Sequence, residues 1–171
     1  MNMTNLSKTQ KLIFSSLIIA LYVVVLYFTQ SFSFGAYQIR IATSLYALSY
    51  LFPFLVLPLG LANLLSNLLF GGLGLLDMFG GCFVGMLTTY LIVCIKKGGL
   101  SKWFMLFPII LGPGLLVPIW LSYLLNTPYS ALAINLCIGQ IIPAVVGVLL
   151  IQPLEQVIYR HPSQSASSTH T

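Results

Sequence analysis

Long apolar segments separated by short polar connections make up most of this sequence. A helix needs about 20 mostly apolar residues to cross a bilayer. The apolar stretch at 41–70 is too long for one span, and Pro53 and Pro58 divide it, because proline disfavours helix in the residue before it. The pattern predicts an all-α protein with six transmembrane helices, at about 12–28, 41–52, 55–70, 78–95, 103–125 and 131–157. Between the third and fourth, a Gly-rich turn at 71–77 ends on Asp77.

The basic residues support this helix count. Lysine and arginine gather on the cytoplasmic side of membrane proteins. With six helices and a cytoplasmic N-terminus, every basic residue except Arg40 lies on that side: Lys8, Lys11, Lys96, Lys97, Lys102 and Arg160. A single span at 41–70 would place the 96–102 loop outside instead. We therefore expect a cytoplasmic N-terminus at 1–11, one six-helix transmembrane domain at 12–159, and a disordered cytoplasmic tail at 160–171.

Composition excludes several classes of protein. Hydrophobic residues make up 58% of the 171 positions and charged residues 5%, whereas a soluble domain carries about 25% charged residues. The net charge of +5 comes from dispersed bases, which argues against a nucleic-acid partner and for a lipid bilayer. The sequence holds two acidic residues and no hydrolase, zinc-protease or P-loop motif. The cysteines are isolated. We expect no catalytic residues, no enzyme activity, no metal and no cofactor.

Several polar residues fall at membrane depth, where they are costly and often functional. In the six-helix topology they share the outer half of the protein: Gln38, Arg40, Asn63, Asn67, Asp77, Asn135 and Gln140. Asn63 and Asn67 lie one helical turn apart, so they share a face. We expect these side chains to converge on one outward-facing cavity. Alternatively, the amides only hold helices together, and Arg40 pairs with Asp77 or with an anionic lipid.

Aromatic residues also gather near this half. Most are interpreted as an interfacial belt, namely Phe34, Tyr46, Tyr50 and Tyr129. Tyr37 is the exception, because it lies beside Gln38 and Arg40. We place it near the cavity.

Three stretches carry a resemblance to a known family. They read Tyr-Gln-Ile-Arg-Ile-Ala at 37–42, Gly-Leu-Ala-Asn-Leu-Leu at 60–65, and Gly-Leu-Gly-Leu-Leu-Asp-Met-Phe-Gly at 72–80. The Leu-Thr-Thr-Tyr-Leu order at 87–91 fits as well. On these motifs the chain resembles the QueT family of queuosine-precursor transporters, which are substrate-binding S components of energy-coupling factor (ECF) transporters. The resemblance spans about 12–159.

The sequence departs from the family pattern at three places. The family usually has Glu where Thr43 stands, and Glu in a Gly-Glu pair where Gly139 and Gln140 stand. The Asn usual in the fifth helix corresponds to Pro113. The two missing carboxylates bear on the identity of the substrate and leave the fold unchanged.

The resemblance implies the rest of a transport machine. It implies an outward-facing site for a deazapurine, such as queuine or its nitrile or aminomethyl precursors, with Thr43 added to the polar residues above. It also implies an ECF transmembrane coupling subunit and two ATPase subunits, with docking through small residues on the first helix, here Ser16 and Ala20. Two alternatives stay open: an S component for another vitamin-like solute, and a structural membrane subunit that transports nothing.

Overall fold

The computed structural model describes residues 6–33, 38–71 and 73–159. The predicted tail at 160–171, Phe34 and Tyr37 lie outside these residues. Within them every regular element is helical, which confirms the all-α prediction. The elements are α1 (Lys8–Ser33), η1 (Ile41–Tyr50), η2 (Pro53–Leu55), α2 (Val56–Ser66), η3 (Asn67–Gly71), α3 (Leu75–Lys97), η4 (Lys102–Met105), α4 (Leu106–Leu125) and α5 (Tyr129–Tyr159).

Five helical segments are long and apolar enough to cross a membrane: Lys8–Ser31, Pro53–Gly71, Leu75–Lys97, Lys102–Leu125 and Tyr129–Ile158. Their outward-facing side chains are large and apolar. Phe28 is 78% exposed and Leu12 is 68% exposed. A water-soluble protein does not leave so continuous an apolar surface uncovered. The structure therefore agrees with a multi-pass membrane protein.

The segment at 41–52 is helical, as predicted, but its geometry differs. Ile41–Tyr50 forms a 3-10 helix, and every residue after Ile41 in it is buried. A 3-10 helix rises about 2.0 Å per residue against about 1.5 Å in an α-helix, so ten residues reach about 20 Å. Small side chains let it run between α1, α3 and α5. At Gly147, an added Cβ would lie 2.9 Å from the Ser44 carbonyl oxygen.

The predicted division of the long apolar stretch is confirmed at Pro53 rather than Pro58. Pro53 opens the short helix η2, after which the chain continues into α2. Pro58 lies in the first turn of α2, where a backbone N–H has no intrahelical partner and its loss costs little. At its C-terminal end α2 widens into the π-helical turn η3, which begins at Asn67. Such turns are rare and often mark functional sites.

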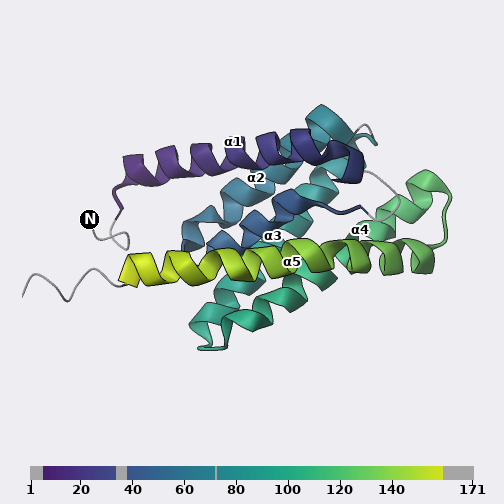
Figure 1. The fold of residues 1–171 in the computed structure, drawn as a ribbon. Helices are drawn as coiled ribbons and strands as arrows, with labels where there is room; N and C mark the ends of the chain where they lie inside the picture. The colour runs from purple at the N-terminus through teal and green to yellow at the C-terminus, as the bar shows by residue number, and fades with distance from the viewer. Residues whose placement is uncertain (1–5, 34–37, 72, 160–171) are drawn as a thin grey trace, which may run out of the picture.

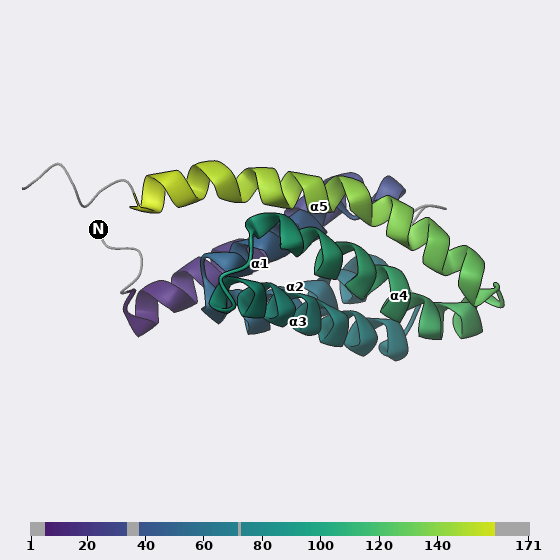
Figure 2. The same cartoon turned by 90° about the horizontal axis from the view of Figure 1, so that it is seen from below.

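The start of α1 and the end of α5 lie at the same end of the helix bundle (Figures 1 and 2). The Lys102 ammonium contacts the Glu155 carboxylate at 2.9 Å, which ties the α3–α4 connection to this end as well. Lys96 lies 5.1 Å from the centre of the Tyr50 ring. The described lysines thus gather at one end, while Arg40 directly precedes η1 at the other.

Candidate functional site

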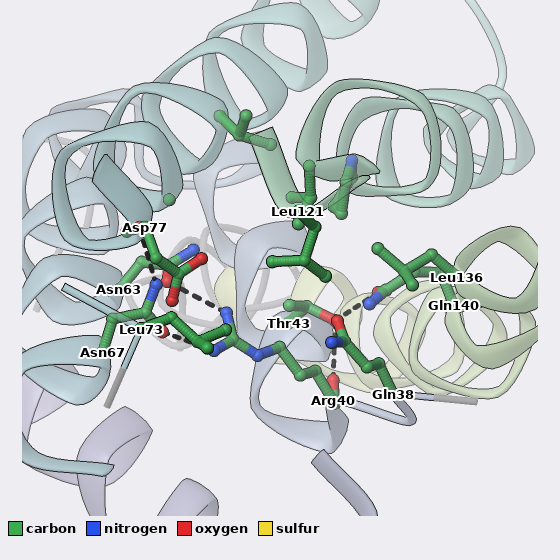
Figure 3. Close-up of a pocket in the computed structure, with 14 residues that line it drawn as sticks. Gln38, Arg40, Thr43, Asn63, Asn67, Leu73, Asp77, Leu121, Leu136 and Gln140 are labelled. Atoms are coloured by element: carbon green, nitrogen blue, oxygen red, sulfur yellow. Dashed lines mark hydrogen bonds between the residues drawn. The ribbon is translucent and has the colours of Figure 1, made fainter. Parts of the chain in front are cut away.

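One pocket collects seven of the eight polar residues that the sequence and the family resemblance single out. They come from the start of η1 and from α2, η3, α3 and α5, and they are Gln38, Arg40, Thr43, Asn63, Asn67, Asp77 and Gln140 (Figure 3). Asn135 is not among the residues that line it. The pocket lies at the end of the bundle opposite the lysines.

Arg40 joins η1 to α2. Its Nη1 donates a hydrogen bond to Asn63 Oδ1 at 3.1 Å, and its Nη2 donates to Asn67 Oδ1. The side chains of Asn63 and Asn67 point to the same place, as their spacing predicts, and they are 4% and 3% exposed. Hydrogen bonds from a charged donor are roughly twice as strong as neutral ones. The guanidinium is therefore held across the pocket by two oriented amides.

Glycines on α3 make room for this arrangement. A Cβ at Gly81 would lie 2.5 Å from Asn67 Nδ2 and 3.0 Å from Asn63 Oδ1. One turn further, a Cβ at Gly85 would lie 3.0 Å from the Tyr46 hydroxyl. Any larger residue at Gly81 would displace the amides that hold Arg40. Gly81 was not identified from the sequence, because its role depends on the contact between α2 and α3.

Asp77 does not lie in a flexible turn, as the sequence suggested; it lies in the first turn of α3, which begins at Leu75. Gly74 precedes the helix with a φ of 87°, a conformation that favours glycine. The helix dipole favours a carboxylate at this position. Asp77 Oδ1 accepts a hydrogen bond from Trp120 Nε1 at 3.1 Å, and the Asp77 backbone carbonyl accepts one from Asn67 Nδ2 at 3.0 Å.

Trp120, on α4, is a second residue that the sequence did not reveal. Its indole ring lies against Gly80, where an added Cβ would be 2.9 Å from Trp120 Cζ2. The ring therefore needs glycine at this position of α3. By fixing one oxygen of Asp77, Trp120 orients the carboxylate toward the pocket. A lone tryptophan near the end of an apolar helix is typical of a membrane interface, so the sequence carried no specific signal.

The assignment of Tyr46 to an interfacial belt was wrong. Tyr46 is 1% exposed and lies in the core. Its hydroxyl accepts a hydrogen bond from Asn63 Nδ2 at 2.7 Å and lies 3.4 Å from the hydroxyl of Tyr22 on α1. Tyr50 is buried as well, whereas Tyr129 is 44% exposed. A line of polar groups thus runs from Arg40 through Asn63 and Tyr46 into the membrane interior.

Thr43 and Gln140 meet on the other side of the pocket. The Thr43 hydroxyl lies 2.8 Å from Gln140 Oε1 and 2.7 Å from the Arg40 carbonyl oxygen, so these two acceptors share its proton. Both residues are 1% exposed. The two positions where the family usually has Glu are therefore in direct contact. Pro113, the third departure from the family pattern, lines the same pocket.

The pocket is narrow and its formal charge is balanced. The centres of water molecules could occupy about 20 Å³ of it, and about 10–15 Å³ suffices for one water. Arg40 carries the positive charge among the lining residues and Asp77 the negative one. Apolar side chains complete the wall: Leu73, Val84, Val117, Leu121 and Leu136. Apolar walls with a small number of placed polar groups are typical of small-molecule sites.

Further hollows lie on the outer surface of the helices. One, between α1 and α2, has a volume of about 410 Å³ and is lined by Ser16, Ala20 and apolar side chains. Both small residues are exposed, and the Ser16 hydroxyl donates to the Leu12 carbonyl within α1 at 3.0 Å. Another is an apolar groove of about 640 Å³ between α3 and α4, lined by side chains such as Phe107. Among the described residues, no His, Cys, Asp and Glu side chains group as metal ligands.

Comparison with known proteins identifies the family. The sequence profile of the QueT transporter family matches residues 12–156, which is most of the chain. No curated protein and no solved structure gives a significant match. The profile match confirms the resemblance seen in the motifs around Arg40, Asn63 and Asp77. This protein therefore belongs to the QueT transporter family and is a multi-pass membrane protein of solute transport.

Proposed function

We propose that this chain is the substrate-binding S component of an ECF transporter and takes up a queuosine precursor, a deazapurine. The observation that carries the proposal is the pocket itself, in which Arg40, Asp77 and four side-chain amides converge at one end of an apolar bundle. Polar groups are costly at membrane depth. The motifs shared with the family supply most of these residues.

Energy for uptake comes from other subunits on this proposal. The 171 residues contain no P-loop motif for nucleotide binding. A transmembrane coupling subunit and two ATPase subunits would supply the work. The exposed strip of α1 at Ser16 and Ala20 is the proposed docking face, because small residues let two helices approach closely.

The pocket faces outward in the proposed orientation. The start of α1 and the end of α5 share one end of the bundle (Figure 1), which requires an even number of crossings. The gathered lysines favour the cytoplasmic side for that end. The ten residues of η1, with their flanks, would make the sixth crossing. The proposed layout keeps 1–11 and 160–171 in the cytoplasm and 12–159 as one transmembrane domain.

A neutral solute fits this pocket better than a cation. The charges of Arg40 and Asp77 balance, and Thr43 and Gln140 form a neutral pair where the family has two carboxylates. Bringing an ammonium group into such a site without a counter-ion costs several kcal/mol. We therefore propose the nitrile precursor as the preferred ligand. The aminomethyl precursor and queuine carry amines that are protonated at neutral pH.

Binding requires the pocket to widen. Space of about 20 Å³ for water centres is too little for a bicyclic solute. Arg40 lies between the Asn63 and Asn67 side and the Thr43 side of the pocket (Figure 3). We expect its guanidinium to leave at least one of the two amides and to donate to the solute instead.

Calorimetric titration of the purified full chain tests the proposal. The nitrile precursor should bind more tightly than the aminomethyl precursor, with riboflavin and biotin as unrelated vitamins for comparison. Tighter binding of the amine would contradict the charge argument. Binding of a vitamin alone would indicate an S component for that solute, and no binding at all would favour a structural subunit. Changing Thr43→Glu together with Gln140→Glu should shift preference toward the amine.

A further inference from the structure

Two side chains of the pocket are buried as residues but keep one polar atom without a hydrogen-bond partner among the described residues. Five lining side chains are at least nine-tenths buried: Thr43, Asn63, Asn67, Asp77 and Gln140. Among the described residues, every polar side-chain atom of the first three has a partner. Asp77 Oδ1 is taken by Trp120 and Gln140 Oε1 by Thr43. Asp77 Oδ2 accepts no hydrogen bond from the described residues, and Gln140 Nε2 donates none to them.

These two atoms lie on opposite sides of the pocket, with Arg40 between them (Figure 3). Asp77 can only accept hydrogen bonds as a carboxylate, Arg40 can only donate, and the Gln140 amide nitrogen can only donate. A solute that displaces water from such a pocket atom loses affinity unless it replaces the hydrogen bond. A solute that satisfies the site must therefore present a donor edge to Asp77, an acceptor near Arg40, and a further acceptor to Gln140, in that order.

A nitrile-bearing deazaguanine has its polar groups in this order. Around its edge run the amino group and the ring N–H, which are donors, then the ring carbonyl, then the nitrile, which are acceptors. We infer that the Asp77 carboxylate accepts hydrogen bonds from the amino and ring N–H edge of the solute, and that the Gln140 amide donates one to the nitrile. The carbonyl then faces Arg40, and the apolar side chains Leu121 and Leu136 lie over the ring. This assignment rests on the proposed function and adds the orientation of the solute to it.

The orientation explains where the chain departs from its family. The substituent that differs among the precursors, nitrile or amine, lies at Gln140 and its partner Thr43. The edge common to all of them lies at Asp77, which belongs to the motif shared with the family. The departures at Thr43 and Gln140 thus fall where the solutes vary.

An exchange of specificity tests the role of Asp77. Because Trp120 donates to one oxygen of Asp77, an asparagine at this position would turn its amide NH2, a donor, toward the pocket. This donor matches the oxo group that the deazaxanthine counterpart carries in place of the amino group. In titrations, the wild-type chain should bind the deazaguanine nitrile at least roughly tenfold more tightly than it binds that counterpart. Asp77→Asn should abolish or reverse this preference. Should the variant keep the wild-type preference while still binding, Asp77 does not read this edge.

A second measurement needs no variant at Asp77. The deazahypoxanthine nitrile, which lacks only the amino group, should bind the wild-type chain roughly tenfold more weakly or worse. Equal binding of the two nitriles would overturn the orientation and leave the proposed function standing. If the wild-type chain binds none of these deazapurines, both the orientation and the proposed function fail.

Gln140→Met tests the other side of the pocket. This variant should bind the nitrile compound more weakly, while its binding of the analogue with hydrogen in place of the nitrile should not change. Weaker binding of both compounds would contradict the assignment of Gln140.

Discussion

Two hollows in this protein differ in size and in chemistry. The groove between α3 and α4 measures about 640 Å³, is open, and is walled by apolar side chains. The polar pocket offers about 20 Å³ to water centres and is crowded by its own hydrogen bonds. In a membrane, an apolar groove costs nothing, because lipid chains fill it. Buried charges and amides are costly in the same place. The polar pocket is therefore the better candidate for a functional site, although it is smaller than the groove.

The comparison also separates the two ends of the molecule. One end carries the described lysines, such as Lys102, which contacts Glu155; the proposed cytoplasmic orientation of this end accounts for them. The opposite end carries Arg40, which that orientation does not account for. Substitutions in the pocket should therefore change solute binding, and substitutions in the groove should not. The following changes are ordered by their expected effect on binding.

The largest loss is expected from Gly81→Ala. The added Cβ would displace the ends of the Asn67 and Asn63 side chains rather than any backbone, so the helices should stay packed while Arg40 and Asp77 lose their partners. At most one of the two asparagine bonds orients Arg40 in the proposed complex, and a hydrogen bond to a charged group is worth roughly 1.5–3 kcal/mol, about tenfold to a hundredfold in affinity. Calorimetry measures this loss, and thermal unfolding in detergent checks the fold. Gly98→Ala, in the loop after α3, is the matched control. An equal loss of solute affinity in both variants would contradict a specific role of Gly81 at the pocket.

Arg40→Ala should weaken binding by about tenfold or more, since a hydrogen bond from a charged group contributes roughly 1.5–3 kcal/mol. Arg40→Lys should restore only part of this, because an ammonium is a point charge and cannot match the planar fork of a guanidinium. Uptake and equilibrium binding are measured for both variants. Unchanged uptake and binding in a well-expressed Arg40→Ala protein would contradict the assignment.

Ser16→Leu and Ala20→Leu should leave solute binding by the isolated chain unchanged while impairing transport. Added bulk on this exposed strip of α1 would keep the coupling subunit away. Binding, transport and co-purification with the coupling subunits are measured together. Exposed Leu17, changed to Ile, provides a control on the same helix. Normal co-purification and transport by both variants would place the docking face elsewhere.

The smallest effect is expected in the apolar groove. Phe107 is 60% exposed there, so Phe107→Ala should change neither solute affinity nor uptake appreciably. The measurement is the same titration used for Arg40→Ala. A tenfold loss at Phe107 would reverse the comparison between the two hollows.

Much of the fold could be predicted from the sequence because the relevant signals are local. Apolar length gave the long helices, proline gave the break before η2, and a four-residue spacing gave the shared face of Asn63 and Asn67. The 3-10 geometry of η1 could not be predicted, because a short segment buried on all sides has no periodicity to measure. The start of α3 was missed because the glycines before it favoured a longer turn.

The site could be predicted only in part, for a different reason. Polar residues at membrane depth are visible in a sequence, so most polar residues of the pocket could be predicted. Their hydrogen-bond partners could not be predicted, because these depend on contacts between distant helices. Thr43 and Gln140 are 97 residues apart and share a hydrogen bond. Tyr46 was assigned to the interface and Trp120 was not singled out, yet their hydrogen bonds place them beside Asn63 and Asp77.

The most direct test of the central claim is an experimental structure of the full chain with the nitrile-bearing deazaguanine bound. The solute should lie in the polar pocket, between Asp77 and Gln140, with Arg40 turned from at least one of its two asparagines toward the ring carbonyl. A solute bound in the α3–α4 groove or in the hollow beside Ser16, with the bonds from Arg40 to Asn63 and Asn67 intact, would contradict the account.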